Sequence, residues 1–279
     1  MMINRKSSIL CVIILGWMLW PVGASAFIPT APHLLDLVIK KIRQPVGMTV
    51  LQHRQVINAN DPELAVTRIE EGLYYRFPGN LRSEIIKGPS YGIFVRSHEE
   101  FLKIQDGYVI SLEKSLSDLY NDILIFRERE TLSNYLEASG IDLELTSLQR
   151  FNDLIMFVIG RPPEAGQVFN SLWVDQDTFL PRKLILHKEG TLVEIYYDEW
   201  ERFSKTWYPM QVTIFFNQEL YSLIKASEVQ LNSDIPVSMF DINALVDLYP
   251  QSVVTQSKTT LEEVEELDRK IEEFEKLFE

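Results

Sequence analysis

Strict alternation of hydrophobic and polar residues marks the second half of the chain. It is clearest from Val193 to Tyr197 and from Met210 to Phe216, where every second residue is apolar. This period of two predicts half-buried antiparallel strands, with one apolar face and an opposite face that carries Glu194, Gln211 and Thr213. The strands predicted in this half lie at 141–145, 154–159, 172–174, 182–187, 192–197, 210–216 and 221–231.

The first half combines looser alternation with two helical patterns. Thr30-Ala31-Pro32 offers an N-cap and a first-turn proline before apolar residues at helical spacing, so a helix is predicted there that ends by Pro45. Residues 112–139 have apolar residues three and four positions apart, which predicts two short helices inserted between two runs of strands. The strands predicted before this insertion lie at 46–52, 64–77, 81–87, 92–97 and 101–105.

A one-sided apolar sheet of about ten strands must curl, and few short helices are present to cover it. Where helices fill the concave face only in part, the sheet encloses a hydrophobic pocket or groove. A sealed core has the same alternation, so both interpretations stay open. The candidate lining residues of this concave face are Phe157, Trp173, Leu184, Leu186, Ile195, Tyr197, Met210, Val212, Ile214 and Phe216.

Residues 1–26 have the three parts of a secretory signal peptide. Arg5 and Lys6 form a basic start, an apolar run covers 9–20, and Ala24-Ser25-Ala26 is a small-residue cleavage site. A retained membrane helix is less favoured, because a span needs about 20 apolar residues. We therefore expect a periplasmic protein with no membrane span after cleavage.

The rest of the chain divides into a domain and a C-terminal segment. No linker-like sequence interrupts residues 27–250, which are expected to form one domain. Within residues 257–279, the acidic segment 261–279 has an apolar stripe at helical spacing and nine acidic against three basic side chains. Three interpretations remain: a helix that packs on the domain, a protruding helix that docks on an envelope protein, and a frayed tail.

Composition narrows the classes of function. A net charge of −13 argues against a nucleic-acid-binding protein, because that affinity comes mostly from Lys and Arg side chains on phosphates. A single cysteine and four scattered histidines argue against an internal disulfide and against a zinc or iron site. We therefore expect neither a cofactor nor a metal.

No catalytic constellation stands out. The sequence has no Gly-x-Ser-x-Gly, no His-Glu-x-x-His and no phosphate-binding glycine loop. His187 lies at a predicted hairpin tip, where it is expected to be exposed rather than a general base. The Asp175-x-Asp177 pattern lacks the glycine and the final glutamate of a calcium loop, so a tight turn is predicted. We expect no catalytic residues and no enzyme.

Two short motifs resemble those of a known family. Leu172 to Leu184 contains a W-x-D-x-x-T-x-x-P pattern and Asn232 to Phe240 an N-x-x-I-P-x-x-x-F pattern, both similar to the LolA/LolB-like periplasmic lipoprotein-carrier superfamily. A Pro-Gly-x-x-Arg sequence at Pro78 to Arg82 and the predicted order of elements agree with it. The likeness covers most of residues 33–243.

The resemblance implies an α+β fold, in which an open, strongly curved antiparallel sheet forms an incomplete β-barrel. Short helices cover its apolar concave face, which receives acyl chains of lipoproteins or lipids. One position departs from the family: where its carrier has an arginine before the proline of an early turn, as a latch for the cover, this chain has Phe77. The neighbouring Arg76 is expected to point to the opposite face.

Two functions from different classes follow. The first is a periplasmic carrier or binding protein for a lipid or a lipoprotein acyl chain. The second is an envelope-sensing regulatory or protein-interaction module that uses the same fold, with the acidic segment 261–279 as its docking element. An envelope hydrolase comes third, because the sequence lacks a nucleophile constellation.

Overall fold

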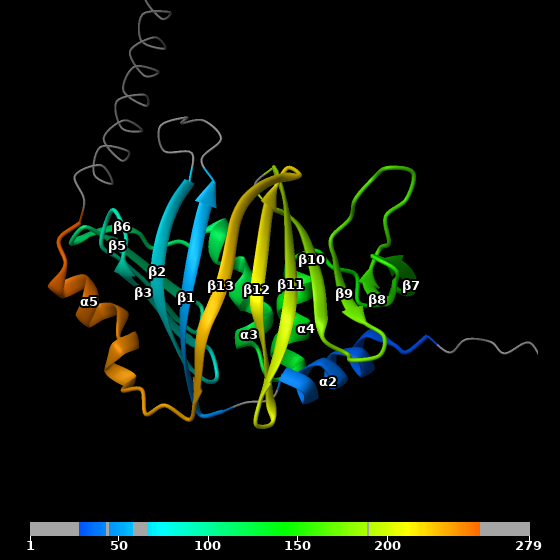
Figure 1. Ribbon diagram of the computed structural model, residues 1–279, viewed down its shortest axis with the longest axis horizontal. Helices are drawn as coiled ribbons and strands as arrows, with labels where there is room; N and C mark the ends of the chain where they lie inside the picture. The colour runs from blue at the N-terminus through cyan, green and yellow to red at the C-terminus, as the bar shows by residue number, and fades with distance from the viewer. Residues whose placement is uncertain (1–27, 43–44, 58–65, 189, 252–279) are drawn as a thin grey trace, which may run out of the picture.

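The computed structural model describes residues 28–42, 45–57, 66–188 and 190–251 (Figure 1). The predicted signal peptide 1–26 and the C-terminal segment 257–279 lie outside these residues. The strands are β1 (Gly47–Ile57), β2 (Val66–Arg76), β3 (Asn80–Lys87), β4 (Gly92–Ser97), β5 (Glu100–Gln105), β6 (Tyr108–Ser111), β7 (Thr146–Phe151), β8 (Leu154–Gly160), β9 (Ser171–Asp175), β10 (Pro181–Lys188), β11 (Thr191–Phe203), β12 (Thr206–Phe216) and β13 (Glu219–Leu231). The helices are α2 (Ala31–Ile42), η1 (Leu116–Asn121), α3 (Asp122–Ile125), α4 (Arg129–Ala138), η2 (Val237–Phe240) and α5 (Ile242–Leu248).

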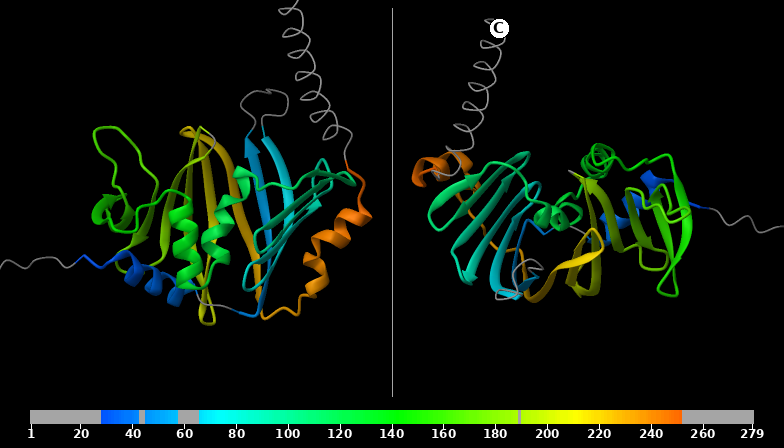
Figure 2. Two further views of the ribbon diagram at one scale, coloured as in Figure 1. Left: turned by 180° about the vertical axis from the view of Figure 1, so that it is seen from behind. Right: turned by 90° about the horizontal axis from the view of Figure 1, so that it is seen from above.

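The described strands form one open antiparallel sheet of thirteen strands, in the order β6-β5-β4-β3-β2-β1-β13-β12-β11-β10-β9-β8-β7. Pairing of β1 with β13 joins two hairpin meanders at the middle of the sheet. Although β6 and β7 are consecutive strands in the sequence, they are the two edges of the sheet. The chain between them therefore has to cross a whole face, and this crossing contains η1, α3 and α4 (Figure 2).

The main core lies between the concave face of the sheet and these helices. It is one continuous apolar cluster, to which α2 adds Leu34, Leu35 and Val38 and α4 adds Leu132 and Leu136. The α2 helix presents these residues because its apolar positions recur at helical spacing. It packs against α4 and β12. The architecture is thus the α+β fold expected from the sequence, an open curved sheet with short helices over its concave face.

A second cluster lies on the opposite, outer face of β4 and β5. Ile93, Val95 and Leu102 alternate outward there and pack against Phe240 of η2 and Leu245 of α5. Seen from above, α5 and α3 flank this part of the sheet from opposite sides (Figure 2). The sequence analysis predicted neither η2 nor α5.

The structure corrects the predicted strands at several places. Residues 141–145 do not form a strand, because Asp142 Oδ1 accepts a hydrogen bond from the Glu144 amide at 3.0 Å and turns the backbone. The predicted bend at 204–209 is shorter, since β11 runs to Phe203 and β12 begins at Thr206, with a positive φ of 56° at Ser204. Strands β6 and β7 were not predicted, and both are short. The tight turn predicted at Asp175 is confirmed: its Oδ1 accepts from the Asp177 and Thr178 amides at 3.0 and 2.8 Å.

Candidate ligand-binding concavity

Nine of the ten predicted lining residues lie together on the concave face. Seven of them are buried in the main core: Phe157, Leu184, Leu186, Ile195, Tyr197, Val212 and Ile214. Met210 and Phe216 are partly buried and pack against the same cluster. The alternation of β8, β10, β11 and β12 therefore placed these nine side chains on one face.

Trp173 is not with the other nine. It belongs to a cluster with Val158 and Ile185 on the outer face, where its Nε1 donates to Ser171 Oγ at 3.0 Å. The inward positions of β9 are taken by Leu172 and Val174. Because a strand turns successive side chains to opposite faces, Trp173 cannot share the concave face with these two neighbours. Its assignment to the concave face was wrong.

The nine inward residues meet helices in this structure. Leu34 and Leu35 of α2, Ile123 of α3 and Leu136 of α4 are completely buried in the same cluster. This part of the concave face is therefore packed core.

Open space on the concave side lies beside that core, between β1–β5 and η1. This rim hollow has a volume of about 190 Å³ and is bordered by Val56, Ile69, Ile85 and Phe94 among apolar residues, and by Arg54, Glu71, Lys103 and Asp118 among charged ones. Ligand pockets for small molecules usually span about 300–1,000 Å³. The rim hollow is therefore smaller than the usual pocket for a small molecule.

A buried polar cluster fastens η1 to the sheet at the floor of the rim hollow. Gln52 Nε2 donates to Glu71 Oε2 at 2.6 Å and to Tyr120 Oη at 3.0 Å. Arg54 Nη2 also donates to Tyr120 Oη, at 3.2 Å, while its Nε lies 3.3 Å from Glu71 Oε2. The Asp118 carboxylate is 4.0 Å from Arg54 Nη1. Three inward side chains of β1 and β2 thus hold two residues of η1.

Charge and burial oppose each other in this first cluster. Burial raises the pKa of the Asp118 carboxyl above its usual value, and the nearby Arg54 offsets this only in part. Burial alone would lower the pKa of Arg54, but Glu71, Tyr120 and Asp118 together raise it. The guanidinium is therefore charged, and its single positive charge offsets part of the negative charge of the two carboxyl groups beside it.

A second buried cluster fastens α3 to β4. Arg96 Nη1 lies 2.7 Å from Asp122 Oδ1, and Lys114 Nζ pairs with Asp122 Oδ2. The Arg96 guanidinium also stacks over the Phe126 ring at 4.6 Å. Burial lowers the pKa of Lys114, although Asp122 counteracts this effect. Asp122 is completely buried, so its two cationic partners compensate a charge that has no access to water.

The position that departs from the family pattern is also resolved. Arg76 points to the outer face, as expected, where its Nη1 donates to the carbonyl oxygen of Ile235 at 2.7 Å. Phe77 makes a cation–π contact with Arg127, which lies between α3 and α4: the guanidinium is 4.6 Å from the centre of the Phe77 ring. Arg127 Nη1 also donates to the carbonyl oxygen of Ile42 at 2.6 Å, and burial lowers the Arg127 pKa to about 9.

Sequence reasoning missed these polar clusters, although a signal for them exists. Gln52, Arg54 and Glu71 occupy the inward positions of strands that otherwise turn apolar residues inward. A charged residue in the buried phase of an alternating strand requires a partner. Those partners come from η1, more than 40 residues away in the sequence, so the strand pattern alone could not identify them.

Within the described residues, no group of three His, Cys, Asp or Glu side chains could hold a metal ion. Among the helices of that part of the chain, none is long and apolar enough to cross a membrane.

Comparison with known proteins gives likeness in structure only. No protein-family model matches the sequence, and no curated protein is significantly similar to it. Solved structures do match: a LolA superfamily protein from Nitrosomonas europaea superposes with a TM-score of 0.55 at 14% identity, covering 77% of this chain and 99% of that one. A domain named for outer membrane lipoprotein sorting, from Vibrio parahaemolyticus, gives 0.53 at 12% identity and covers 77% and 97% of the two chains.

This chain has a LolA-like fold. A DUF1329 family protein from Desulfovibrio piger has a similar fold, with a TM-score of 0.55 at 13% identity over 77% of this chain and 99% of that one. In the present LolA-like chain the curved sheet, the helices crossing its concave face and the two buried clusters are parts of one arrangement. The helices of this cover, α2, α4, η1 and α3, all pack on the sheet with apolar side chains, and η1 and α3 add ionic contacts.

Proposed function

We propose that this protein is a non-enzymatic carrier or binding protein for an acyl chain of a lipid or lipoprotein in the bacterial periplasm. One observation carries the proposal: the apolar concave face of the sheet is covered by separate helices, with an open hollow next to them. An acyl chain that enters at the rim hollow would take over apolar contacts that α3 and η1 make in the closed form.

The energetics of such an exchange are favourable without polar chemistry. Burial of each CH₂ group is worth about 0.8 kcal/mol, so a 16-carbon chain contributes on the order of 10 kcal/mol before ordering costs. Part of this is spent on separating the cover from the sheet. Because each buried ion pair repays only part of its desolvation cost, the ionic end of the cover is the cheaper end to separate.

A matched pair of tryptophan substitutions tests the proposal. Ile85 borders the rim hollow, whereas Ile86 is exposed on the outer face of the same strand. We expect Ile85→Trp to weaken binding of a fluorescent 16-carbon fatty acid at least about 10-fold, which corresponds to 1.4 kcal/mol, because the indole fills the hollow. Ile86→Trp, the control, should bind as the unchanged protein does.

Native mass spectrometry of the gently purified protein supplies the second measurement. An acyl-bearing ligand should be retained by the unchanged protein and by Ile86→Trp, and depleted in Ile85→Trp. Equal binding by both variants, together with no acyl ligand in any preparation, would contradict the proposal.

A further inference from the structure

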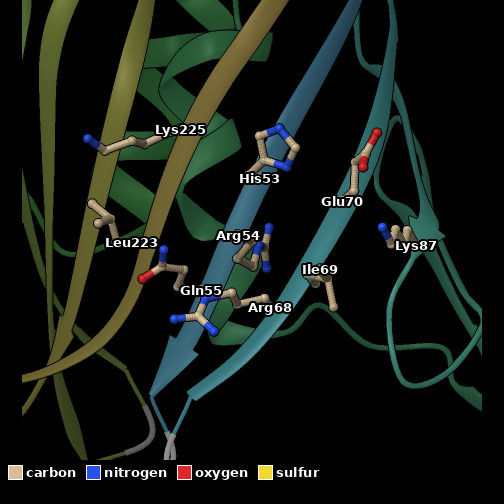
Figure 3. A pocket seen from close by; sticks show the side chains of 9 residues that line it. All are labelled: His53, Arg54, Gln55, Arg68, Ile69, Glu70, Lys87, Leu223 and Lys225. Atoms are coloured by element: carbon tan, nitrogen blue, oxygen red, sulfur yellow. The ribbon is translucent and has the colours of Figure 1, made fainter.

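A second hollow, on the outer face of the sheet, is built from four strands around the β1–β13 junction. This outer hollow has a volume of about 480 Å³ and is bordered on β1, β2, β3 and β13 by His53, Arg54, Gln55, Arg68, Ile69, Glu70, Lys87, Leu223 and Lys225 (Figure 3). Arg54 and Ile69 border the rim hollow too, and the Arg54 side chain bonds to Tyr120 on the concave side. The other seven residues point outward and border only the outer hollow, because Gln52 and Ile224, which alternate with them, belong to the concave side.

Strand register brings the basic residues of the outer hollow together. Lys225 is the direct partner of His53, His53 of Glu70, and Glu70 of Lys87, so four strands contribute one row. The parallel row beside it contains Leu223, Gln55 and Arg68. Directly opposed residues on one face have their Cβ atoms about 5 Å apart, so the charges in these rows act on one another.

The outer hollow is positive in an acidic protein. Arg68, Lys87 and Lys225 are exposed cations, and Glu70 is the one carboxylate among the lining residues. No ion pair within 4.0 Å joins any of these four residues to a described residue. With His53 neutral, the outward residues Arg68, Glu70, Lys87 and Lys225 have a formal charge of +2, and Arg54 brings the whole lining to +3, whereas the whole chain has −13. Such a site favours a polyanionic occupant.

The described chain ends on the same face and at the same end of the sheet. Helix α5 packs on the outer face, and Gln251 after it bridges Val109 of β6. Val109 pairs with Ile104 near the end of β5, and the neighbouring Gln105 pairs with Gly92 at the start of β4. The turn before Gly92 leads back to Lys87 of the outer hollow, so Gln251 and the hollow lie at the same end of the sheet. Strands are about 4.8 Å apart, so the six steps from β6 to β13 amount to about 29 Å. Residues 252–260 can span about 30 Å when extended.

We propose that the acidic segment 261–279 docks intramolecularly on the outer hollow. The segment has nine acidic against three basic side chains, which complements the unpaired Arg68, Lys87 and Lys225. A short tether gives an effective local concentration in the millimolar range, so the segment competes well against free anions. The docked segment withdraws the outer hollow from other anionic partners, and because its contacts are exposed charges, salt releases it.

Paramagnetic relaxation in the full chain tests this docking. A nitroxide is attached at Asp268→Cys, with Cys11, the only cysteine in the sequence, changed to Ser. We expect selective loss of the amide signals of His53, Gln55 and Arg68, and recovery of these signals in about 1 M salt, where the screening length falls to about 3 Å. The charge reversal Lys87→Glu with Lys225→Glu should also restore them, whereas Lys205→Glu, at the exposed β11–β12 turn, should not.

Three results would overturn the proposal. The first is the absence of selective signal loss, including the case in which vesicles of anionic phospholipid perturb the same amides instead. The second is signal loss that survives both the charge reversal and high salt. The third is loss that appears only when nitroxide-bearing chains are mixed with isotope-labelled chains, because the occupant would then be a second copy.

Discussion

The two ends of the concave face are closed in different ways. At β8–β12 the sheet meets α2 and α4 through side chains such as Leu34, Leu136 and Ile195, all completely buried and apolar. At β1–β4 it meets η1 and α3 through apolar residues such as Leu119 and Ile123 and also through the Arg54 and Asp122 clusters, with the rim hollow beside them. The helical crossing therefore rests on apolar packing at both ends, and at the β1–β4 end it also depends on buried charge pairs.

This difference indicates at which end the helices can separate from the sheet. Apolar packing is non-directional and improves with every atom that it removes from water. A buried ion pair needs both partners in register, and its attraction only roughly repays the desolvation of the two charges. We therefore expect the cover to be permanent over β8–β12 and conditional over β1–β4, and three substitutions probe this comparison.

The largest effect is expected at the ionic end. Asp122→Ala leaves Arg96 and Lys114 buried without their carboxylate, and removing one partner of a buried pair costs about 4 kcal/mol. Urea unfolding measures this loss, and hydrogen exchange should accelerate in η1 and α3 but not in α2. Asp36→Ala is the matched control, since Asp36 pairs with Arg129 at the surface, where a pair is worth under about 1 kcal/mol. Equal losses in both variants would contradict the distinction.

The next effect is at the apolar end. Leu136 of α4 is completely buried, so Leu136→Ala should lower the free energy of unfolding by about 3 kcal/mol through lost burial and a new cavity. Exposed Leu154 offers the control, because Leu154→Ala removes the same atoms from a largely solvated site. Hydrogen exchange should now increase across α2 and α4 together. Faster exchange confined to η1 would show that the two ends are not separable as described.

The smallest effect is a pH dependence at Asp118. Burial raises the folded-state pKa of this carboxyl above the unfolded value of 3.8, so the folded chain takes up the proton first as the pH falls. Stability contributed by this group therefore increases as the pH drops through the raised pKa, and the cost of the buried charge is present at neutral pH. The Asp118→Asn substitution removes the titration of this group and the cost of its buried charge. Its stability relative to the unchanged protein should be higher at pH 7 than at pH 4, as followed by urea unfolding at each pH. If the difference in the free energy of unfolding between the two proteins is the same at both pH values, the protonation of Asp118 is not coupled to stability.

Sequence reasoning reached most of the fold because its signals are local. The period-two alternation of Val193 to Tyr197 and Met210 to Phe216 put their inward residues on the concave face. It failed at Trp173, which was assigned to the concave face for its size and apolar character although its position in the alternation of β9 points outward. It also failed at residues 141–145, where the Asp142 side chain makes a turn. Strands β6 and β7 and helices η2 and α5 were missed, because short elements carry little periodic signal.

What the sequence by itself determined is the class of the molecule, because alternation, turn residues and helical spacing are properties of neighbouring residues. Only the tertiary structure decided where Arg54, Asp122 and the basic rows of the outer hollow find their neighbours. Those contacts depend on the register of β13, β1, β2 and β3 and on the path of the chain from β6 to β7. A shift of one residue in register would turn each row to the other face, so the two hollows exist only in the assembled sheet.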